Sequence, residues 1–172
     1  MSVDVLGETV LEAGAGPFDL EAVFHTKYTS IARIISRVIR NPARAEEIAV
    51  DVFLKWSAGQ SEAWLYRVAV RMALDELRRQ TRRARYEHLL ATLRGGPTPE
   101  ELHSSREEQD NVRFVLGLLP RRQSELLLLR NEGLRYDELA AALDLNPVSV
   151  GTLLSRAQQA FRKEYIARYG QQ

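Results

Sequence analysis

Apolar residues recur every three to four positions along most of the chain, and no stretch alternates with the period of two typical of a half-buried strand. The first apolar series runs from about Leu20 to Arg40, with Asp19 as a candidate N-cap and Asn41-Pro42 as its end. One face of this segment carries Val23, Phe24, Tyr28, Ile31, Ile34, Ile35, Val38 and Ile39. The pattern predicts an all-helical fold.

Two further amphipathic segments follow the first. Asn41 and Pro42 favour the start of a second helix, which would turn Ala45, Ile48, Ala49, Val52, Phe53 and Trp56 inward. After the turn SAGQ, Ser61 caps a third and longer helix with Leu65, Val68, Ala69, Met72 and Leu77 on its apolar face. We expect these three helices to share one core.

Residues 84–111 lose this hydrophobicity and contain Gly95-Gly96-Pro97 and Pro99. The stretch predicts a flexible connection, in which Thr98-Pro99-Glu100-Glu101 is a capped start to another helix. The chain then divides into an acidic tail (1–17), a helical domain (18–85), a linker (86–111) and a second helical domain (112–172).

The second domain contains four predicted helices: one ending near Leu118, one over Arg121–Asn131 with Gly133 past its end, one over Tyr136–Leu143, and one from Pro147 to about Tyr169. The last two are spaced as in a helix-turn-helix, with Asp144 where a turn glycine is usual and Asn146-Pro147 as N-cap and first turn. The internal apolar positions are Leu139, Ala140, Leu143, Leu145, Val150 and Leu153. An ordinary helical hairpin would show a similar apolar pattern.

The chain has a net charge of only +1, but its basic residues are concentrated in two blocks. Residues 18–85 hold 13 basic and 8 acidic residues and residues 112–169 hold 9 and 6, while the remainder is acidic. In the third helix Arg67, Arg71, Arg78 and Arg82 fall on one face, where they could bind phosphates. Trp56, Trp64 and Tyr66 lie near its start and could stack on unpaired bases. The alternative is that the tryptophans are core and the arginines form a solvated face.

Catalysis finds little support in the sequence. The chain has no cysteine, which fits a reducing compartment such as the cytosol, and its three histidines are scattered. No glycine loop for phosphates, secretion signal or membrane-length apolar run is present. We expect no enzyme activity, cofactor, metal site or membrane insertion.

Three stretches carry a family resemblance. AEEIAVDVFLKW and EAWLYRVAVRMALDELRR resemble region two of the extracytoplasmic-function group of bacterial sigma factors, in the sigma-70 family. LPRRQSELLLLRNEGLRYDELAAALDLNPVSVGTLLSRAQQAFRK resembles their region four, and the blocks come in the expected order. The chain departs from the family's basic pattern at Leu154, Gln158 and Gln159, which are neutral.

The resemblance implies a cytoplasmic transcription initiation factor that binds core RNA polymerase and promoter DNA. It implies that Glu46, Glu47, Asp51 and Phe53 bind the polymerase. The residues implied to hold and open the −10 element are Trp64, Arg67, Arg71, Arg78, Arg79 and Arg82. Those implied to enter the major groove at −35 are Ser149, Thr152, Ser155 and Arg156. An anti-sigma factor covering apolar faces near Phe53 and Leu127 is a further expected partner.

Two other readings remain open at this point. A stand-alone helix-turn-helix regulator would bind a palindromic duplex without polymerase, because two-fold proteins read two-fold sites. A helical adaptor would show no salt-dependent affinity for nucleic acid.

Overall fold

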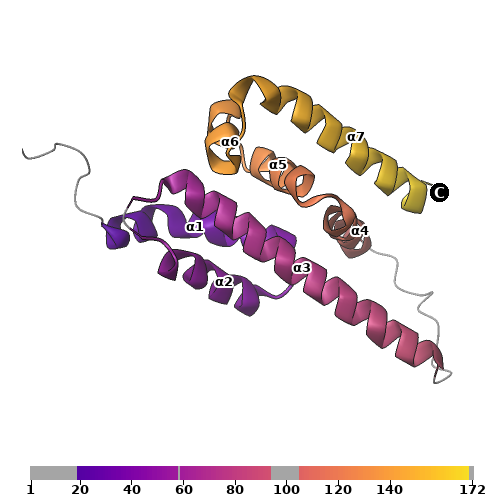
Figure 1. Cartoon of the computed structure of the whole chain (residues 1–172). Helices are drawn as coiled ribbons and strands as arrows, with labels where there is room; N and C mark the ends of the chain where they lie inside the picture. The colour runs from indigo at the N-terminus through magenta and orange to yellow at the C-terminus, as the bar shows by residue number, and fades with distance from the viewer. Residues whose placement is uncertain (1–18, 58, 94–104, 171–172) are drawn as a thin grey trace, which may run out of the picture.

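The computed structural model describes residues 19–57, 59–93 and 105–170, and within these ranges its regular elements are helices only (Figure 1). They are α1 (Leu20–Val38), α2 (Pro42–Leu54), α3 (Glu62–Leu93), α4 (Ser105–Leu118), α5 (Arg121–Asn131), α6 (Tyr136–Leu143), a 3-10 turn η1 (Pro147–Ser149) and α7 (Val150–Tyr169). The all-helical prediction is confirmed.

Side chains set the starts of several helices, as the sequence predicts. Asp19 Oδ1 accepts from the amide of Ala22 at 2.9 Å, and Asn41 Oδ1 accepts from the amide of Arg44 at 3.1 Å. Asn146 does the same for Val148 at 3.1 Å. Each cap satisfies an amide that has no partner within the first helical turn. These contacts fix where α1, α2 and η1 begin.

Helices α1, α2 and α3 form the first region of the molecule. Ile31, Ile34 and Ile35 of α1 are fully or almost fully buried against Ile48 and Val52 of α2 and the core face of α3. At one end an aromatic group closes the core, with ring centroids 5.0 Å apart for Phe24 and Phe53 and 4.8 Å for Phe24 and Tyr28. The predicted three-helix core is present.

Helices α4 to α7 form the second region. Leu139 and Leu143 of α6 and Val150 of α7 are buried where the two helices of the helix-turn-helix meet. Asp144 takes the left-handed conformation, with φ at 53°, that the sequence predicts for the turn position usually held by glycine. Leu154, neutral where the family is commonly basic, is 5% exposed and belongs to the core.

The two regions pack against each other through α3. This helix contacts α1 and α2 on one side and α4, α5 and α6 on the other (Figure 1). Val70, Ala73 and Leu74 are fully buried, although the sequence analysis did not assign them to the apolar face of α3. Buried residues of both regions therefore form one contiguous cluster.

Helical structure occupies much of the predicted connection. The third helix continues to Leu93, and α4 begins at Ser105, so both ends of the stretch 84–111 are helical. The proposed cap at Thr98-Pro99-Glu100-Glu101 lies outside the described residues.

Candidate nucleic-acid interface

The four helix-turn-helix residues that are predicted to contact DNA bases lie on the outer face of the second region. Ser149 ends the 3-10 turn, and Thr152, Ser155 and Arg156 follow on the first turns of α7; all four are exposed. Their inward neighbours Val150, Leu154 and Ala157 are buried. The structure thus gathers the four residues on one accessible helix face, which is the geometry needed to reach base edges in a major groove.

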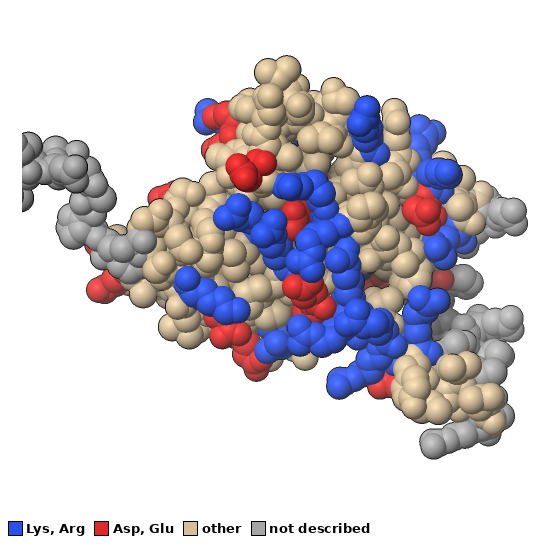
Figure 2. All heavy atoms as spheres, in the orientation of Figure 1, with Lys and Arg blue, Asp and Glu red and all other residues tan. Residues whose placement is uncertain are grey.

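The arginines of α3 form the second basic feature. Lys and Arg side chains gather in a band that follows α3 and the junction between the two regions (Figure 2). Arg79, Arg82, Arg83 and Arg85 are exposed, whereas Arg67, Arg71 and Arg78 are partly buried. The band is the electrostatic pattern that phosphate binding requires.

Within this band, part of the predicted set is already engaged by the second region. Arg71 Nε donates to Glu125 Oε1 at 2.9 Å, and Glu125 is only 1% exposed. Arg78 donates from Nε to the carbonyl of Gly117 at 3.2 Å and from Nη2 to the carbonyl of Leu119 at 3.0 Å. Arg71 and Arg78 are therefore bound within the chain, whereas the alternative of a solvated face does not describe these two side chains.

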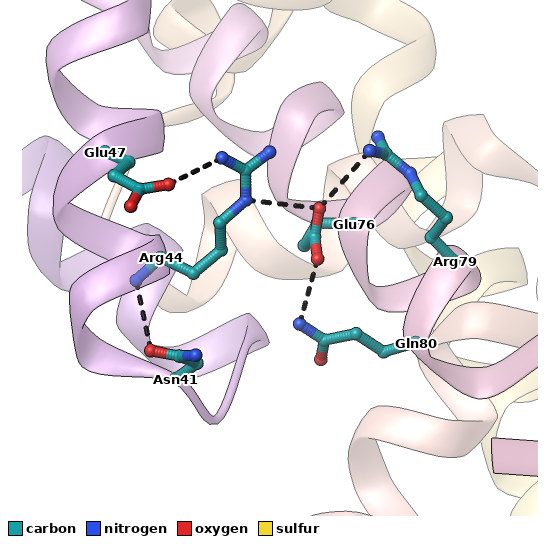
Figure 3. Close-up of polar contacts among 6 residues, drawn as sticks. All are labelled: Asn41, Arg44, Glu47, Glu76, Arg79 and Gln80. Carbon is teal, nitrogen blue, oxygen red and sulfur yellow. Dashed lines mark hydrogen bonds and ion pairs between the residues drawn. The ribbon is translucent and has the colours of Figure 1, made fainter. Parts of the chain in front are cut away.

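Arg79 forms an ion pair with a residue of its own helix, α3. Its guanidinium lies 3.6 Å from Glu76, whose carboxylate also contacts Arg44 and Gln80 (Figure 3). Trp64 is partly buried and packs against the core, as the structural alternative for the tryptophans predicts, and keeps part of its surface accessible. Arg82 remains exposed and could contact a phosphate directly.

A mixed acidic and apolar surface lies on α2. Glu46 and Glu47 are exposed, as a polymerase-binding role requires, and Asp51 is partly exposed. Phe53 is 2% exposed inside the aromatic group with Phe24, so its predicted place on the docking surface is wrong. Burial of its ring makes it a core residue.

Two apolar residues missed by the sequence analysis complete this surface. Val50 is 41% and Leu54 is 73% exposed. They follow Glu46 at spacings of four, which puts all three on one helical face. The spacing of four could have predicted this exposed face from the sequence. The resemblance instead assigned the apolar contact to Phe53, the neighbour of Leu54. Glu125 was missed as well, because glutamate is rarely buried and nothing in the sequence near it names Arg71 as its partner.

The described parts of the chain show neither a metal-binding cluster nor a membrane-spanning helix. Residues 19–57, 59–93 and 105–170 contain no group of three or more His, Asp or Glu side chains placed to hold a metal ion. No helix in these ranges is long and apolar enough to cross a membrane.

Comparison with known proteins gives matches to both regions. Residues 24–83 match the family model for sigma-70 region 2, and residues 109–160 match the model for sigma-70 region 4. The ECF RNA polymerase sigma factor SigE of Mycolicibacterium smegmatis is 27% identical over 150 residues, covering 81% of this chain and 58% of SigE. The ferric citrate uptake sigma factor FecI of Escherichia coli is 27% identical over 158 residues, covering 84% of this chain and 91% of FecI.

A solved structure shares the fold. The sigma factor RpoE from Bartonella quintana, crystallised with the anti-sigma factor NepR, matches with a TM-score of 0.50 at 16% identity, over 84% of this chain and 95% of that chain. The matches to regions 2 and 4 follow the same order as the two helical regions of the fold. The chain belongs to the sigma-70 family of RNA polymerase sigma factors, in the extracytoplasmic-function group.

Proposed function

We propose that this chain directs promoter-specific transcription initiation by binding core RNA polymerase through α2 and promoter DNA through α3 and α7. The observation that carries the proposal is the ordered pair of accessible surfaces on a two-region fold: an acidic and apolar face on α2 and a polar reading face on α7. The chain supplies recognition, and the polymerase supplies the chemistry. Its place of action is that of the polymerase, the cytoplasm.

On α2 the docking surface consists of Glu46, Glu47, Val50, Asp51 and Leu54. Charged residues around an exposed apolar centre suit a specific protein interface, because the apolar centre gives affinity and the charges give orientation. Leu54 is the anchor, since it exposes most of its side chain on a rigid helix.

The two DNA contacts divide the work. Ser149, Thr152, Ser155 and Arg156 read the −35 element, with Arg156 as their only cation. Arg67, Arg71, Arg78, Arg79 and Arg82 hold the −10 element by its phosphates, and Trp64 supports an unpaired base. Neither contact needs to be strong alone, because attachment to one polymerase raises the effective concentration of each.

Run-off transcription with purified core polymerase, the full chain and a pool of genomic promoter fragments tests this proposal. We expect discrete start sites that require the chain, and their upstream sequences define the two elements. Leu54→Ser should abolish these transcripts while leaving direct DNA binding intact, and the exposed Thr29→Ser serves as control. If no transcript depends on the chain, the proposal is wrong, and tight binding to a palindromic duplex alone would favour a stand-alone regulator.

An anti-sigma factor is a second expected partner. A groove of about 800 Å³ lies where the end of α1 meets α4, α5 and α7. Its lining includes the apolar residues Val112, Leu127, Leu128 and Phe161 and the charged residues Arg37, Glu108, Arg113 and Arg130. A lining that is partly apolar and has more cations than acids fits an amphipathic helix with acidic residues beside its apolar face. Phe53, the other expected contact, is buried and cannot take part without rearrangement.

A further inference from the structure

The contacts between the two regions use side chains that the proposed function assigns to DNA. On α3, Arg71 and Arg78 belong to the −10 set, and both are bound by the second region. Between them Asp75 Oδ1 accepts from Arg121 Nη2 at 2.5 Å. These three contacts, formed by Arg71, Asp75 and Arg78 with α4 and α5, are here called the latch.

Two contacts of the latch satisfy groups that would otherwise be costly to bury, whereas the pair of Asp75 and Arg121 is partly exposed. Glu125 is 1% exposed, and a buried carboxylate without a cation is strongly unfavourable, so Arg71 is required where it lies. Arg78 donates to the carbonyls of Gly117 and Leu119, which lie at the carboxyl end of α4. Helix ends present carbonyls without helical partners and a partial negative charge, which a guanidinium offsets.

Apolar packing and a second polar group support the same closed arrangement. Leu77 of α3 packs beside Gly117, where a Cβ would come within 3.7 Å of its side chain. At the end of α1, Arg37 pairs with Glu132, and Arg113 Nε donates to the carbonyl of Arg37 at 3.0 Å. Just past this helix, Arg40 pairs with Asp110 at 2.8 Å. The two regions are therefore joined by two groups of specific contacts, one at the latch on α3 and one at the end of α1.

We infer that the second region acts as an intramolecular inhibitor: in the closed chain it occupies the donors of Arg71 and Arg78, so that −10 DNA can bind only after the latch opens. This inference rests on the proposed function, because it assigns the α3 arginines to DNA. The reading face on α7 stays exposed in the closed chain, so −35 binding is unaffected by the latch. The latch therefore sets the order of DNA binding: the −35 element binds before the −10 element.

Variants on the second region test the latch without altering the DNA-binding arginines. Glu125→Gln keeps the shape of the side chain and removes its charge, and Arg121→Gln, at an exposed position, removes the pair with Asp75. Losing the buried contact with Glu125 should shift the closed-to-open equilibrium by about tenfold, and losing the partly exposed pair with Asp75 by about threefold. The affinity for DNA that binds only the open state rises by the same factors. Asp137→Asn removes a carboxylate of the second region that pairs only with Arg135 there, and is the matched control.

Affinities are measured with the full chain and two fluorescent probes taken from a promoter mapped by run-off transcription. One is a forked DNA carrying its −10 segment, and the other is a duplex carrying its −35 segment. We expect Glu125→Gln to bind the forked probe about tenfold more tightly and Arg121→Gln about threefold more tightly, with duplex binding unchanged in both. Asp137→Asn should equal the natural chain on both probes. Equal affinity of all four proteins for the forked probe would overturn the latch.

A cross-linking experiment tests the latch in the opposite direction. Because the chain has no cysteine, Asp75→Cys and Arg121→Cys together introduce a unique pair for a short, cleavable bis-maleimide. The locked protein should lose forked-probe binding, keep duplex binding, and recover on cleavage of the linker. Undiminished forked-probe binding by the locked protein contradicts the inference. Failure of the proposed function looks different, since no transcript would then depend on the chain in any variant.

Discussion

The Nε of Arg44 on α2 lies 3.4 Å from the carboxylate of Glu76 on α3, and this pair joins two helices of the first region (Figure 3). Glu76 also accepts from Gln80 at 3.1 Å and lies 3.6 Å from Arg79, with its side chain 13% exposed. The hydrogen bond from Arg44 to Glu47, reinforced by Glu76, raises the pKa of Arg44. Glu76 is therefore the common acceptor of a small network.

Replacing Glu76 should cost stability and disturb Arg79. We expect Glu76→Ala to lower the free energy of unfolding by about 1–3 kcal/mol, because partly buried donors lose their acceptor. The exposed partner Glu47 gives the comparison, since Glu47→Ala should change it by less than about 0.5 kcal/mol. Urea titration measures both, and equal effects would show that burial of Glu76 is unimportant.

Phe53 and Leu54 are neighbours with opposite expected roles. Phe53→Ala should lower the free energy of unfolding by about 3–5 kcal/mol through loss of core packing. Leu54→Ser should leave unfolding within about 0.5 kcal/mol and weaken binding to core polymerase at least tenfold. Thermal unfolding and a polymerase pull-down distinguish the two, and a stable Phe53→Ala chain that fails to bind polymerase would restore Phe53 as a contact.

Arg156 is the only cation among the four reading residues. Arg156→Ala should weaken binding to the −35 duplex by about 1–3 kcal/mol, whether the arginine contacts a base or a phosphate. The two cases differ in specificity: loss of a base contact relaxes the preference at one position, whereas loss of a phosphate contact weakens all sequences equally. Arg168→Ala, at the far end of α7, is the control, since Arg168 pairs with Glu164 and lies over the ring of Phe114.

The turn of the helix-turn-helix contains backbone strain. Asp144 has φ at 53°, and a side chain in this conformation costs free energy that glycine avoids. We expect Asp144→Gly to be neutral or to raise the free energy of unfolding by up to about 1 kcal/mol, and Asp144→Val to lower it by at least about 1 kcal/mol. Denaturant unfolding of the pair checks this, and equal stability of both variants would contradict the strain.

Alkaline pH should weaken one contact between α1 and α3. Lys27 lies 2.8 Å from Glu62, and this hydrogen bond raises the pKa of Lys27 above 10.5 despite some desolvation. Because the folded chain holds this proton more tightly, the pair stabilises it fully below pH 10.5 and less as pH rises above that value.

Lys27→Met should therefore cost less than about 1 kcal/mol near neutral pH, because both side chains are partly exposed. The difference from the natural chain should shrink above pH 10.5. A difference that stays constant through pH 11 would assign the effect of Lys27 to packing of its methylenes.

Local signals in the sequence predicted the helices well. Asp19, Asn41 and Asn146 cap the helices that they were expected to cap, because capping depends on residues within one turn. The helix-turn-helix was predictable for the same reason. The hydrophobic period also found the α1 core, since Ile31, Ile34 and Ile35 lie on one face of one helix.

The packing of the two regions could not be read from local signals. Val70, Ala73 and Leu74 are fully buried, and the apolar pattern of one helix does not show which other helices cover it. The partner of Arg71 could not be predicted either, because a row of arginines on a helix has the same pattern whether it faces phosphate, water or a buried carboxylate. The apolar pattern of α2 correctly turned Phe53 inward, whereas its expected role in polymerase binding came from the family resemblance and conflicts with its burial.

Helix α3 packs against both regions of the molecule. Neither region is therefore easily replaced by the corresponding region of another sigma factor. A chimaera that joins residues 19–93 to the second half of another sigma factor would set Val70, Leu74 and Leu77 against an unmatched surface. Arg71 would lose Glu125 as its acceptor. Transplanting promoter preference by swapping domains therefore demands that α4 and α5 stay with α3, and that only the turn and α7 be exchanged.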